Sequence, residues 1–376
     1  MTKTAFALGL AALLASTTGL LSLTAAAAED KVVHVYNWSD YIDASVLEDF
    51  TKETGIKVQY DVYDSNDVLE TKLLAGKTGY DVVVPTSSFL ARQIKAGVHS
   101  VLDKSKIPNL KNMWPLVTER LAKYDPNNDH AVNYMWGTTG IGYNVKKIKA
   151  IMPDAPIGSW KMVFDPAIAA KFKDCGIMML DADDEVIPSM MAYLGMNPDS
   201  KNPDDFKKAE EALLKVRPFI RKFHSSEYIN AMANGEICIA LGWSGDFSQA
   251  QSRAAEKNKT IKDEAQQTEI AYFIPKEGAD MWFDSMAIPA DAPNKENAYA
   301  FINFMQRPEV AAKNTNFVSY ANGNLASQKL ITPEILGNPN IYPDADTQKR
   351  LFTITPYDKK AQRALTDTWR NIKTGS

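Results

Sequence analysis

Histidine, cysteine and clustered positive charge are scarce in this chain of 376 residues. It has 4 histidines and 2 cysteines, and its formal net charge at pH 7 is -4. A nucleic-acid partner requires a stripe of lysine and arginine, and no such stripe is present. The histidines are scattered without the spacing of metal ligands; they are His34, His99, His130 and His224. We therefore expect neither a bound metal nor a nucleic-acid partner.

Catalytic and nucleotide-binding motifs are also incomplete. The segment GWSGD resembles a nucleophile elbow, but Asp246 stands where the second glycine should be, so Ser244 is a weak nucleophile candidate. The segment GTTGIGYN lacks the lysine of a phosphate loop and the final glycine of a dinucleotide fingerprint. We expect no enzyme and no cofactor; a hydrolase or lyase acting on amines is the remaining catalytic alternative.

Long apolar runs are confined to the N-terminus. Residues 1–28 carry one basic residue, Lys3, before an apolar core that closes on alanines, which is typical of a secretory signal peptide cleaved near Ala28. A membrane anchor is the alternative, but polar residues and a glycine at positions 16–19 interrupt the run and no basic flank follows. The rest of the chain has no stretch long enough to span a bilayer, so we expect an exported protein without membrane insertion.

The two cysteines lie at the start of or inside apolar, strand-like runs, Cys175 in DCGIMML and Cys238 in GEICIAL. An even pair of this kind in an oxidising compartment predicts a disulfide. Closing a loop of this length stabilises a fold by roughly 4 kcal/mol on the chain-entropy model. Two buried, reduced cysteines that never meet are the alternative.

About 350 residues follow the signal peptide, too many for one core and enough for two lobes. VVHVYNW predicts a strand, ASVLEDFTKETG a helix ending at Gly55, and DVVVP a buried strand before a helix that Ser87 or Ser88 caps. Strand and helix in alternation predict an α/β fold with a mainly parallel sheet flanked by helices. The glycine-rich residues 136–144 predict an extended crossing between lobes, and residues 204–223 predict one long helix.

Tryptophan precedes aspartate by two or three positions in three places, of which two follow predicted strands. The pairs are Trp38 with Asp40, Trp243 with Asp246, and Trp282 with Asp284. Each pair alone has a plain explanation, because tryptophan packs in cores and aspartate forms turns or caps helices. Three such pairs, two of them at the carboxyl ends of strands, offer indole faces and carboxylates, which suit primary ammonium groups. No basic residue lies in these stretches to bind a carboxylate or phosphate, so we predict a ligand with more than one cationic centre.

At these motifs the chain resembles the bacterial periplasmic polyamine-binding proteins of ABC transporters, closest to the putrescine-binding branch. The similarity covers essentially the whole mature chain and is carried by VYNWSDYID, YDVVVPTSSFLARQ, WGTTGIGYN, LDADDEV, IALGWSGD, WFDSMAIP and SYANGN. It implies a two-lobed, type II-like periplasmic binding protein that closes on a polyamine in the interlobe cleft. We expect lobes at 29–136 plus 283–320 and at 137–282 plus 321–376, and a monomer.

The resemblance further implies that the protein delivers its ligand to an inner-membrane ABC permease. Putrescine is the expected ligand and spermidine the near alternative. A polyamine sensor of the same fold is a second alternative, which would bind the same molecule but serve another partner.

Binding roles follow from the resemblance position by position. The indoles of Trp38, Trp243 and Trp282 would flank the methylene chain, and Asp40, Glu185, Asp246 and Asp284 would receive the ammonium groups. The polar lining would be completed by Ser39, Tyr41, Thr86 and Tyr320. Glu185 and Tyr320 rest on the resemblance alone.

Two features depart from a simple transfer of these roles. Relatives tend to carry phenylalanine where this chain has Trp282, which implies a smaller pocket here. Asp183 and Asp184 precede Glu185, and their added negative charge would favour a longer polyamine unless both side chains face solvent.

Overall fold

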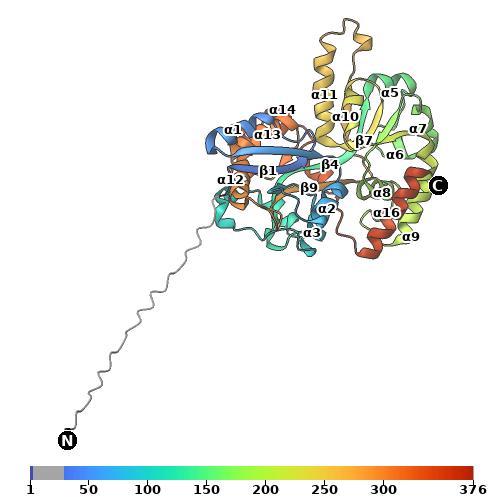
Figure 1. Cartoon of the computed structure of the whole chain (residues 1–376). Helices are drawn as coiled ribbons and strands as arrows, with labels where there is room; N and C mark the ends of the chain where they lie inside the picture. The colour runs from blue at the N-terminus through green and yellow to red at the C-terminus, as the bar shows by residue number, and fades with distance from the viewer. Residues whose placement is uncertain (3–28, 376) are drawn as a thin grey trace.

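The computed structural model describes residues 1–2 and 29–375, and Figure 1 shows their path. The predicted signal peptide lies outside the described residues except for Met1 and Thr2, so it stays a prediction. Among the described residues, no helix combines the length and the apolar character needed to cross a membrane.

The first of two lobes, on the left of Figure 1, is built around parallel strands. β1 pairs in parallel with both β2 and β3. Helix α1 ends before Gly55, as predicted, and its Phe50 is buried against α12, with ring centroids 5.3 Å from Phe301. The elements of this lobe are β1 (Val32–Trp38), α1 (Ala44–Thr54), β2 (Lys57–Tyr63), α2 (Asn66–Ala75), β3 (Val82–Val83), α3 (Ser87–Lys95), η1 (Lys104–Lys106), η2 (Pro108–Asn112), α4 (Pro115–Leu121), η3 (Pro126–Asn128), α12 (Lys295–Met305) and α13 (Pro308–Val318).

The second lobe has its own core, in which Trp160, Phe206 and Phe247 are fully buried. β5 pairs in parallel with β6 and β7, and the C-terminal helix α16 lies beside α9 (Figure 1). Its elements are α5 (Val145–Ile151), α6 (Lys161–Phe164), α7 (Pro166–Phe172), β5 (Ile177–Met179), α8 (Asp183–Tyr193), α9 (Pro203–Val216), η4 (Arg217–Phe219), β6 (Ile220–Phe223), α10 (Glu227–Ala233), β7 (Ile239–Trp243), α11 (Ser244–Asn258), η5 (Glu264–Gln266), β8 (Ile270–Phe273) and α16 (Lys359–Thr374).

The prediction of one long helix over residues 204–223 was wrong. α9 ends at Val216, and the last four residues form strand β6. Pro218 lacks the backbone N–H that a continuing helix requires, so the chain leaves the helix there through the short η4 turn.

Two long strands, β4 (Ala131–Asn144) and β9 (Ala279–Ala287), run through both lobes. Residues 131–138 of β4 pair with β9, and residues 139–144 pair with β7 and β8, all antiparallel. The predicted extended crossing at residues 136–144 is therefore confirmed. The two-lobed α/β fold is confirmed as well, but its sheets are mixed, because these strands run antiparallel between the parallel outer strands.

The remaining C-terminal segment bears on the lobe boundaries. Its elements are β10 (Ala321–Asn322), η6 (Leu325–Leu330), α14 (Pro333–Leu336), α15 (Ala345–Gln348) and β11 (Leu351–Phe352). β10 pairs with β4 at Met135 and Trp136, and the Asn322 amide donates to the Thr315 hydroxyl of α13. The predicted boundaries stay a prediction, but these contacts favour placing β10 with the first lobe rather than the second.

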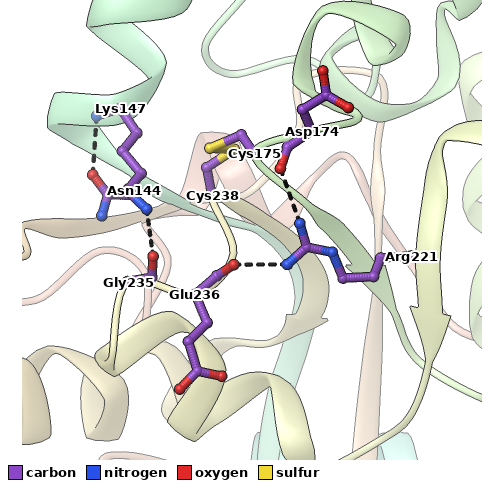
Figure 2. The surroundings of a disulfide bond; sticks show 8 residues. All are labelled: Asn144, Lys147, Asp174, Cys175, Arg221, Gly235, Glu236 and Cys238. Atoms are coloured by element: carbon purple, nitrogen blue, oxygen red, sulfur yellow. Dashed lines mark hydrogen bonds between the residues drawn. A yellow bond between two sulfur atoms is a disulfide. The ribbon is translucent and has the colours of Figure 1, made fainter.

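The predicted disulfide is confirmed: Cys175 and Cys238 are bonded, with their Cα atoms 5.6 Å apart. Figure 2 shows the Arg221 guanidinium beside it, donating to the carbonyl oxygens of Asp174 at 3.0 Å and Glu236 at 2.8 Å. The disulfide and this bridge tie together the segments that lead into β5 and β7. The carboxyl ends of both strands reach the cleft described next.

Candidate functional site

A cleft between the lobes encloses about 660 Å³, part of it open to solvent. It lies where β1, β5 and β7 end, as expected for the ligand site of an open α/β sheet. Every predicted ligand-binding residue except Asp40 lines it: Trp38, Ser39, Tyr41, Thr86, Glu185, Trp243, Asp246, Trp282, Asp284 and Tyr320. We call this space the inner cleft; the binding roles of its residues stay a prediction.

Asp284 presents a buried carboxylate from strand β9, only 4% exposed. Its Oδ2 accepts a hydrogen bond from the Tyr41 hydroxyl at 2.9 Å, and its Oδ1 accepts one from the Thr86 hydroxyl at 2.7 Å. Burial raises the pKa of Asp284 to about 7, although these two hydrogen bonds oppose the rise. Near neutral pH, the carboxyl group of Asp284 therefore lies close to the midpoint between its protonated and its ionised form.

Thr86 also corrects an expectation about helix α3. The helix begins at Ser87, and Thr86 takes the N-cap position without a side-chain capping bond. Its hydroxyl instead donates to Asp284 and accepts from the Asn66 amide at 3.0 Å. The Thr86 side chain therefore fixes the orientation of the Asp284 carboxylate and does not cap helix α3.

Asp246 repeats this arrangement in the opposite lobe, in the first turn of α11. Its two carboxylate oxygens accept hydrogen bonds from the hydroxyls of Tyr228 at 2.5 Å and Tyr320 at 2.6 Å. Burial raises the pKa of Asp246 to about 7, against the effect of both bonds. Tyr320 follows α13 of the first lobe, so this contact joins the two lobes.

Glu185 supplies a third buried carboxylate, from the first turn of α8. It accepts hydrogen bonds from the Thr139 hydroxyl and, at 3.1 Å, from the Trp243 indole N–H. Burial raises the pKa of Glu185, and the charge of neighbouring Asp184 adds to the rise. Asp184 lines the inner cleft and Asp183 is buried, so neither of these acids simply faces bulk solvent.

Hydroxyl and indole groups are the hydrogen-bond donors to these three carboxylates among the described residues, and no lysine or arginine is paired with them. Removing a carboxylate from water without a counter-ion costs several kcal/mol, which is why the pKa values rise. A ligand that brings its own positive charges removes this cost at each group. The electrostatics of the inner cleft therefore favour a cationic ligand over a neutral or anionic one.

Aromatic rings close around the carboxylates. The ring of Trp38, at the end of β1, lies edge-on to the ring of Trp243, with 5.5 Å between the ring centroids. The centroids of the Trp243 and Trp282 rings are 6.4 Å apart. The Trp38 indole N–H is tied to the Val84 carbonyl at 2.9 Å, which fixes that ring in place. Such rings suit the methylene chain of a ligand and the faces of its ammonium groups.

Two glycines allow this close ring packing. A Cβ at Gly137 would lie 2.6 Å from the Trp282 ring, and one at Gly245 would lie 2.4 Å from the Tyr320 ring. Neither clash has room to relax, since both rings are buried. The glycine-rich segment at 136–144 thus admits an aromatic wall in addition to crossing between lobes.

Asp40 does not take the predicted role of an ammonium partner in the structure. It adopts a left-handed backbone conformation, with φ 53°, and its side chain leaves the inner cleft. Its Oδ1 instead accepts from the Arg253 guanidinium of α11 at 2.6 Å. The structure therefore gives Asp40 an ion pair between the lobes instead of a place in the ligand site.

Several lining residues were missed from the sequence: Asp64, Ser65, Asn66, Asp67, Phe89, Asp181, Ala182, Ser225 and Ser226. Asp64 directly follows β2, and Ser225 follows β6. The rule that ligands gather at the carboxyl ends of strands would have found both positions. Tyr228, which holds Asp246, offered no such signal because it lies inside α10.

Histidine, cysteine and acidic side chains do not gather in groups of three or more that would hold a metal ion anywhere in the described part of the chain.

Comparison with known proteins places the chain among transport proteins. The family model described as bacterial extracellular solute-binding protein matches residues 45–342. The chain is 53% identical over 359 residues to the putrescine-binding periplasmic protein SpuD of Pseudomonas aeruginosa, covering 95% of this chain and 96% of the relative. It is 49% identical over 368 residues to the putrescine-binding periplasmic protein PotF of Escherichia coli, covering 97% and 98%.

A solved structure of a substrate-binding protein is also similar to this chain. The spermidine/putrescine ABC transporter substrate-binding protein PotD from Streptococcus pneumoniae superposes with a TM-score of 0.71 at 32% identity. The match covers 92% of this chain and 99% of that protein.

Proposed function

This chain belongs to the bacterial extracellular solute-binding protein family, and we propose that it captures putrescine in the periplasm for an inner-membrane ABC permease. The family confirms the resemblance predicted from the sequence motifs. It is a family of binding proteins, in agreement with the expectation that the chain is not an enzyme.

The positions of two buried carboxylates are the main reason for proposing a ligand with two ammonium groups. Buried carboxylates without a basic partner occur in both lobes, Asp284 in the first and Asp246 in the second. A diamine brings one ammonium group for each and a methylene chain for the indoles between them. An amino acid would need a basic group for its carboxylate, and the described lining of the inner cleft has no lysine or arginine.

Binding and closure are coupled in this proposal. Trp38 of the first lobe lies against Trp243 of the second, and the Tyr320 hydroxyl donates to Asp246 across the lobes. A ligand that pairs with carboxylates from both lobes stabilises this closed arrangement more than an open one, which drives a hinge motion. The closed form is then the one presented to the permease, and the protein acts as a monomer.

Spermidine is the second candidate, because Asp184 also lines the cleft and adds a carboxylate beyond the two, Asp246 and Asp284, that a diamine would meet. A polyamine sensor would use the same site, and only the identity of the protein partner separates sensing from transport.

Isothermal titration tests the proposal. The mature protein is stripped of carried-over ligand by unfolding and refolding, then titrated with putrescine, cadaverine, spermidine and butane-1,4-diol. We expect tight one-to-one binding of putrescine and no heat from the diol, which has the same chain length without charge. Absence of heat from every polyamine would contradict the proposed function and leave the fold unaffected.

A further inference from the structure

The inner cleft continues outward into a second hollow, which we call the outer groove. It encloses about 880 Å³, much of it open, between the start of α2 and the C-terminal helix α16. Asp64, Ser65, Asp67, Asp181 and Ser225 line both spaces. A ligand longer than a diamine, anchored in the inner cleft, would therefore extend toward α16.

Lys373 of α16 lines this outer groove and pairs with a carboxylate that faces both spaces. Its ammonium lies 2.8 Å from Oδ1 of Asp181, the residue just beyond β5. The same oxygen accepts the indole N–H of Trp369 at 2.9 Å, and the ammonium lies 5.8 Å from the centre of that ring. Lys373 thus has the surroundings that the inner cleft offers a ligand: a carboxylate beside an indole.

The position of Lys373 is fixed independently of its charge. The Arg217 guanidinium donates to the Lys373 carbonyl oxygen at 3.1 Å and 2.9 Å, which anchors the end of α16 to the rest of the lobe. A tethered cation competes with a ligand cation at high effective concentration. A third ammonium reaching Asp181 would have to displace it.

We propose that Lys373 is a specificity-determining residue, an internal counter-ion that occupies the outer end of the site and disfavours polyamines with an ammonium beyond the second. The proposal rests on the proposed function, because it presumes a polyamine in the inner cleft. Lys373 acts on the ligand through Asp181, by neutralising the carboxylate that a triamine would otherwise use.

The test compares spermidine with putrescine by isothermal titration in four variants. Lys373→Met removes the charge and keeps the length, and Lys373→Arg keeps the charge. Lys360→Met removes an exposed charge from the first turn of the same helix as a control for overall charge. The double variant Lys373→Met with Asp181→Asn removes the carboxylate that the proposal requires.

We expect Lys373→Met to raise the ratio of spermidine to putrescine affinity roughly fivefold, the size of a partly exposed ion pair. Lys373→Arg and Lys360→Met should leave the ratio unchanged, and the double variant should lose the gain. An unchanged ratio in Lys373→Met, or an equal rise in Lys360→Met, would overturn the proposal while putrescine binding stood. If the unmodified protein bound no polyamine, the proposed function itself would fail.

Discussion

The acidic side chains at the two ends of the interlobe cleft have different kinds of partner. At the inner end, Asp246 and Asp284 are held by hydroxyl groups of tyrosine and threonine. At the outer end, Asp181 is paired with Lys373, and Asp67 lies 3.8 Å from Arg92. Asp181 therefore has a cation from the protein itself, whereas Asp246 and Asp284 have none in the part of the chain that the structure describes, and this contrast is the reason for proposing that a ligand supplies the missing positive charges.

The largest expected effect comes from making an inner acid neutral. Asp284→Asn keeps the shape of the side chain but removes the charge that an ammonium would meet. We expect putrescine affinity to fall roughly 100-fold or more, the result of breaking one partner of a buried ion pair. Titration calorimetry measures the loss, with the exposed acid Glu48→Gln as the matched control.

The same variant should gain stability without ligand. The pKa of Asp284 is about 7 in the folded protein, above the ordinary value of 3.8, so the folded state binds more protons than the unfolded state between these values. The contribution of Asp284 to the free energy of unfolding therefore falls as the pH rises from about 4 to about 7, and it stays low at higher pH. The amide introduced by Asp284→Asn does not ionise, so this variant should raise Tm more at pH 8 than at pH 5. An affinity loss below tenfold, or no gain in Tm, would contradict the assignment of this acid to the ligand.

An intermediate effect is expected from the aromatic wall of the inner cleft. Trp243→Ala should weaken binding of all the diamines by roughly 30-fold, because a desolvated cation–π contact contributes about 2 kcal/mol. Trp243→Phe retains a ring face and should lose less, although it also removes the hydrogen bond to Glu185. Unchanged diamine affinity in Trp243→Ala would show that this indole serves only the core.

The smallest effect is expected at Asp40, which does not line the inner cleft. Its ion pair with Arg253 is partly exposed, and such pairs contribute little. Arg253→Met and Asp40→Asn should therefore change putrescine affinity by roughly threefold or less, and by similar amounts. A large loss of putrescine affinity in Asp40→Asn but not in Arg253→Met would show that the Asp40 carboxylate contacts the ligand.

Much of the inner cleft was predictable, because its carboxylates and indoles follow strands. Trp38 and Trp243 end β1 and β7, and strand ends meet at one edge of a parallel sheet. The same rule placed Asp40 in the inner cleft, but its left-handed backbone conformation directs the side chain away from the cleft. That conformation depends on the surrounding fold and is not evident from the local sequence. Glu185 and Tyr320 came from family resemblance, since nothing local distinguished them.

The fold was predictable to a similar degree. Local patterns identified the two-lobed α/β architecture and the extended crossing, whereas the pairing of β4 with β9 depends on segments far apart in sequence. Pro218 was a local signal that was present and overlooked. The internal pairing of Asp181 with Lys373 was beyond reach, because 192 positions separate the two residues.

The most direct test of the account is the number of protons released when putrescine binds. Burial in the closed arrangement raises the pKa of Asp246 and of Asp284 to about 7, so in this arrangement both carboxyl groups are partly protonated near neutral pH until a cation binds. A bound ammonium favours the ionised form and expels these protons. Calorimetric titration at pH 7 in buffers of different ionisation enthalpy should therefore reveal release of roughly one proton per putrescine, and fewer at pH 8.5. Binding without proton release at pH 7 would mean that the ligand does not pair with these carboxylates.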